Sequence, residues 1–173
     1  LREMRQAGVP VLPMLTNNYG GDFNPQAIGR IMSDKNKRDK FVSSLLATCR
    51  RYHFEGINID LEELNINDNA LLTNFVAELY HTFHANNMYV TQDVMPFNDD
   101  YDMQQLARYN DYLFLMAYDE HNTTSAPGDV ASQHWMEKAT DWAAKNIPND
   151  KLVLGLAGYG YDWAAGADCN TVS

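Results

Sequence analysis

Five apolar stretches with the length and composition of buried strands alternate along this chain with segments that have the spacing of amphipathic helices. Neighbouring parallel strands need a long crossover connection, usually a helix, so this alternation predicts an α/β fold with a parallel sheet. The expected strands cover residues 9–15, 55–64, 88–95, 112–118 and 151–157. The expected helices begin after the capping residues Asn24, Ser33, Asp68, Asp102 and Ser132.

Two architectures are compatible with five such units. An open doubly wound sheet is complete with five strands, whereas a (β/α)8 barrel needs eight strands and about 250 residues. The periodicity of the sequence agrees with both. In either architecture functional side chains belong at the carboxyl ends of the strands. The residues expected at that end are Asn17, Glu62, Phe97, Asp119 and Tyr159.

Length and charge restrict the ligand. The 173 residues predict a single domain, and their longest apolar runs are much shorter than a membrane span. The formal net charge of −10 disfavours nucleic acids and anionic membrane surfaces, and it favours a neutral or cationic ligand. Cys49 and Cys169 are too few and too far apart for a disulfide framework or a zinc knuckle.

The second expected strand carries polar side chains in an apolar setting. Asn58, Asp60 and Glu62 alternate with apolar residues, so in a strand they project from one face. Buried carboxyl groups are costly unless paired, and no Lys or Arg occurs between Arg51 and Arg108. Burial and the neighbouring Asp60 should raise the pKa of Glu62, which suits a general acid. A metal site or ion pairs are the alternatives, but zinc ligands are missing nearby, so we expect catalysis without metal or cofactor.

Three segments resemble motifs of the family 18 glycoside hydrolases, the chitinase-like enzymes. GINIDLEE at 56–63 resembles their DGxDxDxE signature, LMAYDEH at 115–121 their MxYD strand, and LGLAGYGYDW at 154–163 the strand after it. The resemblance implies a (β/α)8 TIM barrel in which the strand at 9–15 is the third of eight. Residues 1–173 would then be an incomplete excerpt with about strands 3 to 7, a single catalytic-barrel domain truncated at both ends.

The same resemblance implies a glycosidase. Enzymes of this family cleave β-1,4 bonds beside N-acetylglucosamine with retention, and the acetamido group of the substrate takes the part of a protein nucleophile. The segments YDEH at 118–121, PGDVASQHW at 127–135 and KLVLGLAGYGYDW at 151–163 look closest to bacterial members linked to peptidoglycan or poly-N-acetylglucosamine metabolism. This implies an extracytoplasmic or secreted protein, acting at the cell surface as part of a larger multidomain chain. The expected partner is an oligo- or polysaccharide, with no nucleic acid and no membrane span in this segment.

The resemblance also assigns roles, position by position. Glu62 would protonate the leaving oxygen and later activate water, and Asp60 would orient the acetamido group and stabilise its positive charge. Tyr118 would hydrogen-bond the acetamido carbonyl, while Asp119 would contact the sugar and tune Glu62. Asn58 completes the catalytic set. The expected substrate-binding residues are Asn17, Met95, Phe97, Met116 and Tyr159.

Two positions depart from the family pattern. Asn58 stands where an Asp is usual, and Glu55 replaces the leading Asp. Asn58 cannot titrate, but its amide can donate a hydrogen bond that favours ionised Asp60, so we expect retained activity with a simpler acid limb in the pH profile. Two other functions remain open. One is a non-catalytic chitinase-like glycan-binding module, and the other is a doubly wound domain for a small ligand or nucleotide, although the sequence lacks a glycine-rich phosphate loop.

Overall fold

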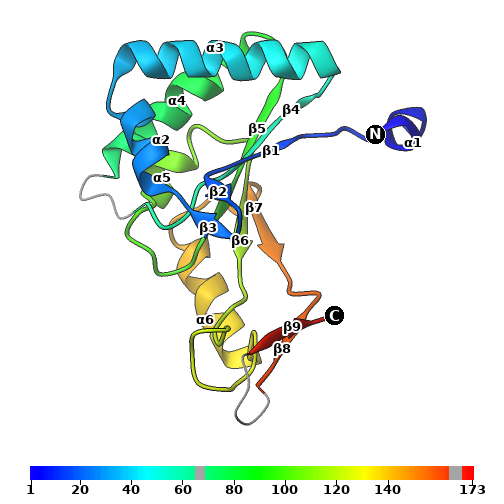
Figure 1. The fold of residues 1–173 in the computed structure, drawn as a ribbon, viewed down its shortest axis with the longest axis vertical. Helices are drawn as coiled ribbons and strands as arrows, with labels where there is room; N and C mark the ends of the chain where they lie inside the picture. The colour runs from blue at the N-terminus through cyan, green and yellow to red at the C-terminus, as the bar shows by residue number, and fades with distance from the viewer. Residues whose placement is uncertain (65–68, 164–168) are drawn as a thin grey trace.

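A five-stranded parallel sheet forms the centre of the computed structural model, which describes residues 1–64, 69–163 and 169–173 (Figure 1). Its strands, in spatial order, are β1 (Met14–Thr16), β4 (Gly56–Asp60), β5 (Tyr89–Val94), β6 (Tyr112–Met116) and β7 (Leu152–Gly155). Each strand pairs with the next sheet strand along the chain, whereas a doubly wound sheet reverses its order at a switch point. The observed order therefore excludes the doubly wound alternative and is that of a barrel wall.

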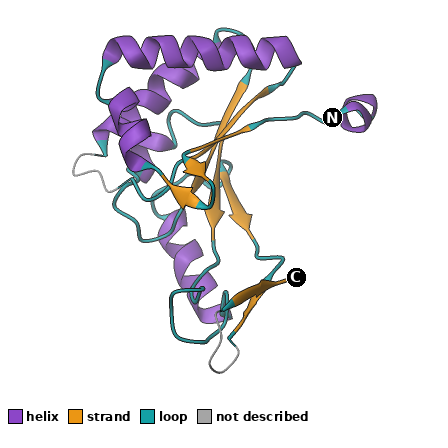
Figure 2. Ribbon diagram, viewed as in Figure 1, coloured by secondary structure: helices purple, strands orange, loops and turns teal. Residues whose placement is uncertain are grey.

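Helices connect these strands and gather on one side of the sheet (Figure 2). They are α2 (Pro25–Met32), α3 (Lys35–Tyr52), α4 (Ala70–His84), α5 (Met103–Leu106) and α6 (Gln133–Ala144). The short helix α1 (Arg2–Gln6) stands apart at the end of an extended segment (Figure 1). Among the described helices, none combines the length and the apolar character that a membrane crossing requires.

The hydrophobic core lies between the helices and one face of the sheet. Ile57 and Ile59 of β4 are buried there together with alternate residues of the neighbouring strands. Side chains of the opposite parity project to the other face, as the period of two requires. That face bounds a cavity of about 690 Å³, lined by Asn58 and Asp93 among others. The outer core and the inner cavity together describe a segment of a (β/α)8 barrel wall.

Capping residues account for most of the helix starts. Ser33 is wrong as a cap, because it continues the helical backbone of α2, while the extended Asp34 accepts two hydrogen bonds from the first turn of α3. Asp68 lies outside the described residues. Three predicted caps are confirmed. In each, the side chain accepts a hydrogen bond from the backbone N–H three residues later, and the caps are Asn24, Asp102 and Ser132.

The first strand is shorter than expected. The sheet pairing of β1 begins at Met14, because Pro10 and Pro13 have no N–H to donate. Glu55 ties the preceding segment to β4 instead, since its Oε2 accepts a hydrogen bond from the Val11 N–H at 2.7 Å. The departure from the family pattern at Glu55 thus has a structural role.

The expected strand at 55–64 also ends early, at Asp60, so Glu62 lies in the loop that follows β4. Two hairpins were not expected. The first lies within the predicted loop after β1 and pairs β2 (Asn18–Tyr19) with β3 (Asp22–Phe23). The second pairs β8 (Gly160–Asp162) with β9 (Asn170–Val172).

Candidate active site

A cavity of about 170 Å³ lies at the carboxyl ends of β4, β5 and β6. Six of its lining residues are site residues that the sequence predicts, so residues far apart along the chain meet as expected. Met14 and Asp93 are the two that the prediction missed. The complete lining is Met14, Asp60, Glu62, Asp93, Met95, Met116, Tyr118 and Asp119.

Asp60 and Glu62 form an acidic pair in this cavity. Burial, followed by the negative charge of Asp60, raises the pKa of Glu62 to about 7. Burial also raises the pKa of Asp60, and a hydrogen bond with Glu62 opposes that rise. Within the described chain, Asp60 Oδ1 is buried and has no hydrogen-bond partner. Glu62 is therefore still partly protonated near neutrality, and both carboxyl groups of the coupled pair line the cavity.

The backbone between these carboxyl groups is held from two sides. Asn17 Nδ2 donates to the Glu62 carbonyl oxygen at 2.8 Å, and the Glu62 N–H donates to Asn17 Oδ1 at 2.9 Å. The buried Tyr101 hydroxyl donates to the Leu61 carbonyl oxygen at 2.9 Å. Both ends of the Asn17 amide are thus engaged by protein, so its geometry supports positioning of Glu62 more than the predicted contact with sugar.

Substitution of Asn17 distinguishes these two roles. The change Asn17→Ala removes both hydrogen bonds to the Glu62 backbone, and we expect kcat to fall about tenfold and the free energy of unfolding to fall by about 1–2 kcal/mol. KM should change by less than about twofold, since Asn17 is not among the described residues that line the cavity. Steady-state kinetics and chemical denaturation measure both quantities, with Asn36→Ala on exposed α3 as the matched control. A rise in KM at unchanged kcat would return Asn17 to the substrate-binding set.

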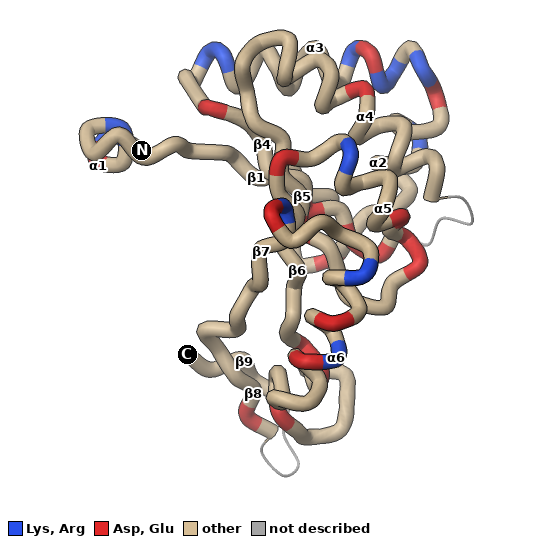
Figure 3. Tube along the Cα trace, turned by 180° about the vertical axis from the view of Figure 1, so that it is seen from behind, with Lys and Arg blue, Asp and Glu red and all other residues tan. Residues whose placement is uncertain are grey.

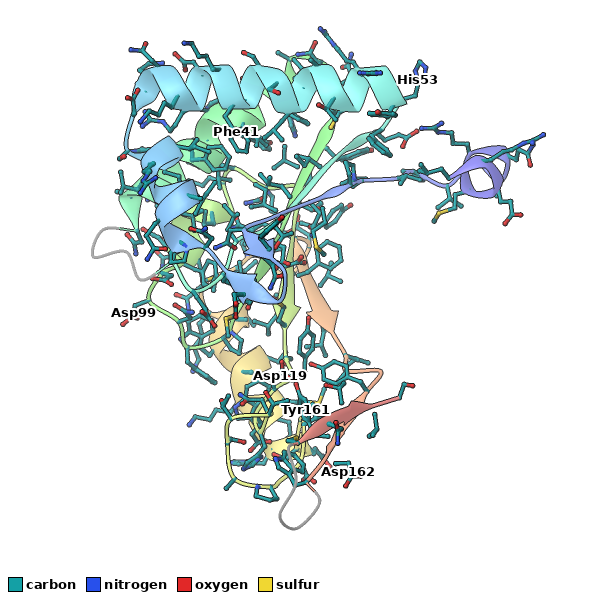
Figure 4. All side chains as sticks on the ribbon, in the orientation of Figure 1. Phe41, His53, Asp99, Asp119, Tyr161 and Asp162 are labelled. Atoms are coloured by element: carbon teal, nitrogen blue, oxygen red, sulfur yellow. The ribbon has the colours of Figure 1, made fainter. Side chains whose placement is uncertain are left out.

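Asp119 receives two tyrosine hydroxyl groups. Tyr159 and Tyr161 both donate to Asp119 Oδ1, at 2.6 and 2.7 Å. Figure 4 shows Asp119 next to Tyr161 of β8. The Tyr159 ring also meets the Tyr118 ring edge-on, with 6.0 Å between centroids. Tyr159 therefore adjoins the cavity through Asp119, and Tyr161 is a neighbour that the prediction missed.

Tyr118 keeps its hydroxyl proton under all ordinary conditions. Burial raises its pKa to about 12, and the negative charges of Asp93 and Glu62 act in the same direction. A protonated phenol that borders the acidic pair can donate a hydrogen bond to a carbonyl oxygen of a bound ligand.

Phe97 lies apart from this cavity. Its ring packs on Trp142 with 5.4 Å between centroids, and Lys138 Nζ lies 5.5 Å from the ring centre. These three residues border a separate groove. Phe97 has a positive φ of 58° and is 45% exposed. The structure does not bring Phe97 to the carboxyl pair, and a role in sugar binding stays a prediction.

Asn58 has a different partner from the expected one. Its Nδ2 donates to Asp93 Oδ2 at 2.6 Å, and its Oδ1 accepts from the Thr91 hydroxyl at 2.7 Å. The expected hydrogen bond to Asp60 is thus replaced by one to β5. A signal for Asp93 was present in the sequence, because Thr91, Asp93 and Met95 share one face of a strand next to β4.

The charge of the cavity is one-sided. Its lining contains Asp60, Glu62, Asp93 and Asp119, and no Lys or Arg is among the described lining residues. Basic residues are frequent along α3, at the far end of the molecule from the β8–β9 hairpin (Figure 3). In the described part of the chain, no group of three or more His, Cys, Asp or Glu side chains is arranged to hold a metal ion. The cavity suits a ligand without negative charge.

Comparison with known proteins gives a consistent result. The model of the family described as glycosyl hydrolases family 18 matches residues 12–171. A relative from Bacillus subtilis, named an uncharacterized glycosylase, YvbX, is 31% identical over 151 residues, which are 82% of this chain and 44% of the relative. A cortical fragment-lytic enzyme from the same organism is 23% identical over 94% of this chain and 40% of its own length.

A solved chitinase from Chromobacterium violaceum shares the fold. Its structure superposes with a TM-score of 0.91 at 27% sequence identity, over 98% of this chain and 56% of the chitinase chain. The present chain therefore spans about half the length of the proteins that it matches.

Proposed function

The chain belongs to family 18 of the glycosyl hydrolases, and on that basis we propose that it carries the active site of a retaining glycosidase for glycans that contain N-acetylglucosamine. The observation that carries this proposal is the Asp60–Glu62 pair, in which Glu62 has a pKa of about 7 and lies at the carboxyl end of β4. A carboxyl group with such a pKa is half protonated near neutrality, so it can serve as an acid and then as a base.

The reaction needs two steps at the anomeric carbon. In the first, Glu62 gives its proton to the leaving glycosidic oxygen while the acetamido oxygen of the substrate bonds to the anomeric carbon. In the second, Glu62 takes a proton from water, whose oxygen attacks the same carbon and releases the acetamido oxygen. Two inversions give net retention. Asp60, which lines the cavity, stabilises the positive charge that the acetamido group carries between the steps.

Tyr118 and Asp119 complete the set. The protonated Tyr118 hydroxyl donates a hydrogen bond to the acetamido carbonyl oxygen and thereby directs that oxygen to the anomeric carbon. Asp119 is fixed by the hydroxyl groups of Tyr159 and Tyr161, so it contacts the sugar in a defined orientation. Met95 and Met116 provide the apolar walls of the cavity.

The substrate and setting follow from the same features. The acidic cavity favours uncharged sugar units, and relatives named as a chitinase and a cortical fragment-lytic enzyme support chitin-type oligomers, peptidoglycan or poly-N-acetylglucosamine. Such polymers lie outside the cytoplasm, which supports an extracytoplasmic site of action. Residues 1–173 would contribute part of one catalytic barrel in a larger chain. A non-catalytic glycan-binding module would have no use for a carboxyl group tuned to neutrality, and Glu62 therefore favours the enzyme.

The pH dependence of hydrolysis tests this proposal. Glu62 must be protonated to act as the acid, and its proton is lost as the pH rises through about 7. We expect kcat/KM to fall about tenfold per pH unit above that value. Release of reducing ends from N-acetylglucosamine oligomers and from peptidoglycan by the full-length protein, measured from pH 4 to pH 10, gives the profile. Hydrolysis that stays constant up to pH 9 would exclude Glu62 as the acid.

A further inference from the structure

The hydrogen bonds of Asn58 fix the direction of its amide. The Thr91 hydroxyl donates to Asn58 Oδ1 at 2.7 Å, so the amide nitrogen must face the opposite way. There Nδ2 donates to Asp93 Oδ2 at 2.6 Å. A carboxylate accepts this hydrogen bond and a protonated carboxyl oxygen does so less well, so the Asn58 amide favours ionised Asp93. Asn58 and Asp93 thus form one polar unit that joins two strands.

Strand register places Asn58 one step below Asp60 and Asp93 beside it. Asn58 of β4 pairs with Thr91 of β5 in a parallel ladder. Two residues further along each strand, Asp60 and Asp93 project from the same face at the same level. Asp93 lines the cavity that contains Asp60 and Glu62, and it also lines the larger inner cavity with Asn58. Asp93, together with Met14 and Tyr118, therefore lies between the catalytic cavity and the larger inner cavity.

The groups around Asp93 are acidic or neutral. Asp60 faces it from β4, Tyr118 faces it from the end of β6, and Glu62 and Asp119 share its cavity. No Lys or Arg lines either cavity in the described part of the chain. Burial raises the pKa of Asp93 to about 6, the negative charge of Asp60 adds to the rise, and the Asn58 hydrogen bond opposes it. Because such coupling is reciprocal, ionised Asp93 also opposes the ionisation of Asp60.

We propose that Asp93 is a positioning residue for the Asp60–Glu62 pair, held by Asn58, and that it supplies from β5 the third carboxyl group that the family pattern has at position 58 of β4. This inference rests on the proposed function. Ionised Asp93 keeps the shared proton on the pair, so that Glu62 remains an acid at higher pH. The site then holds three interacting carboxyl groups. We therefore expect the acid limb of the pH profile to reflect their coupled titration, and not the simpler limb that Asn58 alone would give.

Relocation of the carboxyl group tests the proposal. In Asp93→Asn the third negative charge is lost, and we expect the alkaline limb of kcat/KM to move to lower pH by about one unit, which lowers kcat/KM about tenfold at pH values above the limb. The double variant Asn58→Asp/Asp93→Asn places the third carboxyl group on β4 instead of β5. The amide at position 93 can then donate the hydrogen bond and the carboxylate at position 58 can accept it. This double variant should restore the wild-type limb. Asp150→Asn, at an exposed position before β7, is the control and should leave the profile unchanged.

A mere packing role for Asp93 would give other results. An alkaline limb that does not move in Asp93→Asn would overturn the proposal, as would a double variant whose limb stays at the Asp93→Asn position. If Asp93→Asn alone does not fold, the double variant is compared with the wild type, and a displaced limb in the double variant rejects the idea.

A titration without turnover separates this proposal from the proposed function. In the full-length protein with ¹³C-labelled Asp and Glu carboxyl groups, the NMR titration of Asp60 and Glu62 should move to lower pH in Asp93→Asn and return in the double variant. This measurement requires no hydrolysis. A wild-type protein without activity would therefore reject the proposed glycosidase function, while the titration would still test the role of Asp93. Unchanged titration curves would contradict the positioning role, whatever the activity.

Discussion

Glu62→Gln is expected to lower kcat by about 10³-fold or more on N-acetylglucosamine oligomers. The amide has nearly the shape of the carboxyl group, but it can neither donate the proton to the leaving oxygen nor take one from water. The protein should stay folded, because Asn17 binds the backbone of residue 62 and not its side chain. Reducing-end assays at the pH optimum, with thermal unfolding as a check of the fold, measure this effect.

The neighbouring Glu63 provides the matched control. It is exposed and receives the same chemical change in Glu63→Gln, and we expect kcat within about threefold of the wild type. If the two variants lose activity equally, or if Glu62→Gln retains more than a tenth of the wild-type rate, then Glu62 is not the acid.

Asp60→Asn should have the second largest effect, a loss of about 10²- to 10³-fold in kcat. Asp60 lines the cavity, its buried Oδ1 has no protein partner among the described residues, and a neutral amide in its place cannot balance the positive charge of the acetamido group. A second consequence concerns the pKa of Glu62. Since the charge of Asp60 raises that pKa, its removal should move the alkaline limb of the residual activity to lower pH.

The residual activity of Asp60→Asn is measurable with an activated aryl glycoside of N-acetylglucosamine over a range of pH. A loss of less than tenfold, or an alkaline limb that moves to higher pH, would contradict the role given to Asp60. Asp99→Asn, in the exposed loop after β5, is a control for the general effect of removing a negative charge near the strand ends.

The sequence predicts the fold well because the relevant signals are local. Alternation of apolar and polar residues identifies the β4 face that carries Asp60, and capping side chains such as Asn24 and Ser132 mark helix starts. The choice between a barrel and a doubly wound sheet is not local. It depends on which strands pair with each other. The periodicity of the sequence contains no information about that pairing, and only the resemblance to family motifs indicates the barrel.

The sequence also predicts the acidic pair, whose two members are only two residues apart and stay close although β4 ends at Asp60. It does not predict the contacts that cross between strands. The Asn58–Asp93 hydrogen bond depends on the register of β4 against β5, and the Asn17 contact with residue 62 depends on where β4 ends. Phe97 is another example, because it follows β5 in the chain while its ring packs on Trp142 and away from the acidic pair.

The stereochemistry of hydrolysis tests the central claim most directly. Proton NMR follows the anomeric signals while the full-length protein cleaves an N-acetylglucosamine oligomer in buffered D₂O. A retaining, substrate-assisted reaction at Asp60 and Glu62 predicts that the β-anomer of the new reducing end appears first and then mutarotates. Initial release of the α-anomer would contradict this mechanism, and tight binding of the oligomer without any cleavage would show a glycan-binding protein instead of a glycosidase.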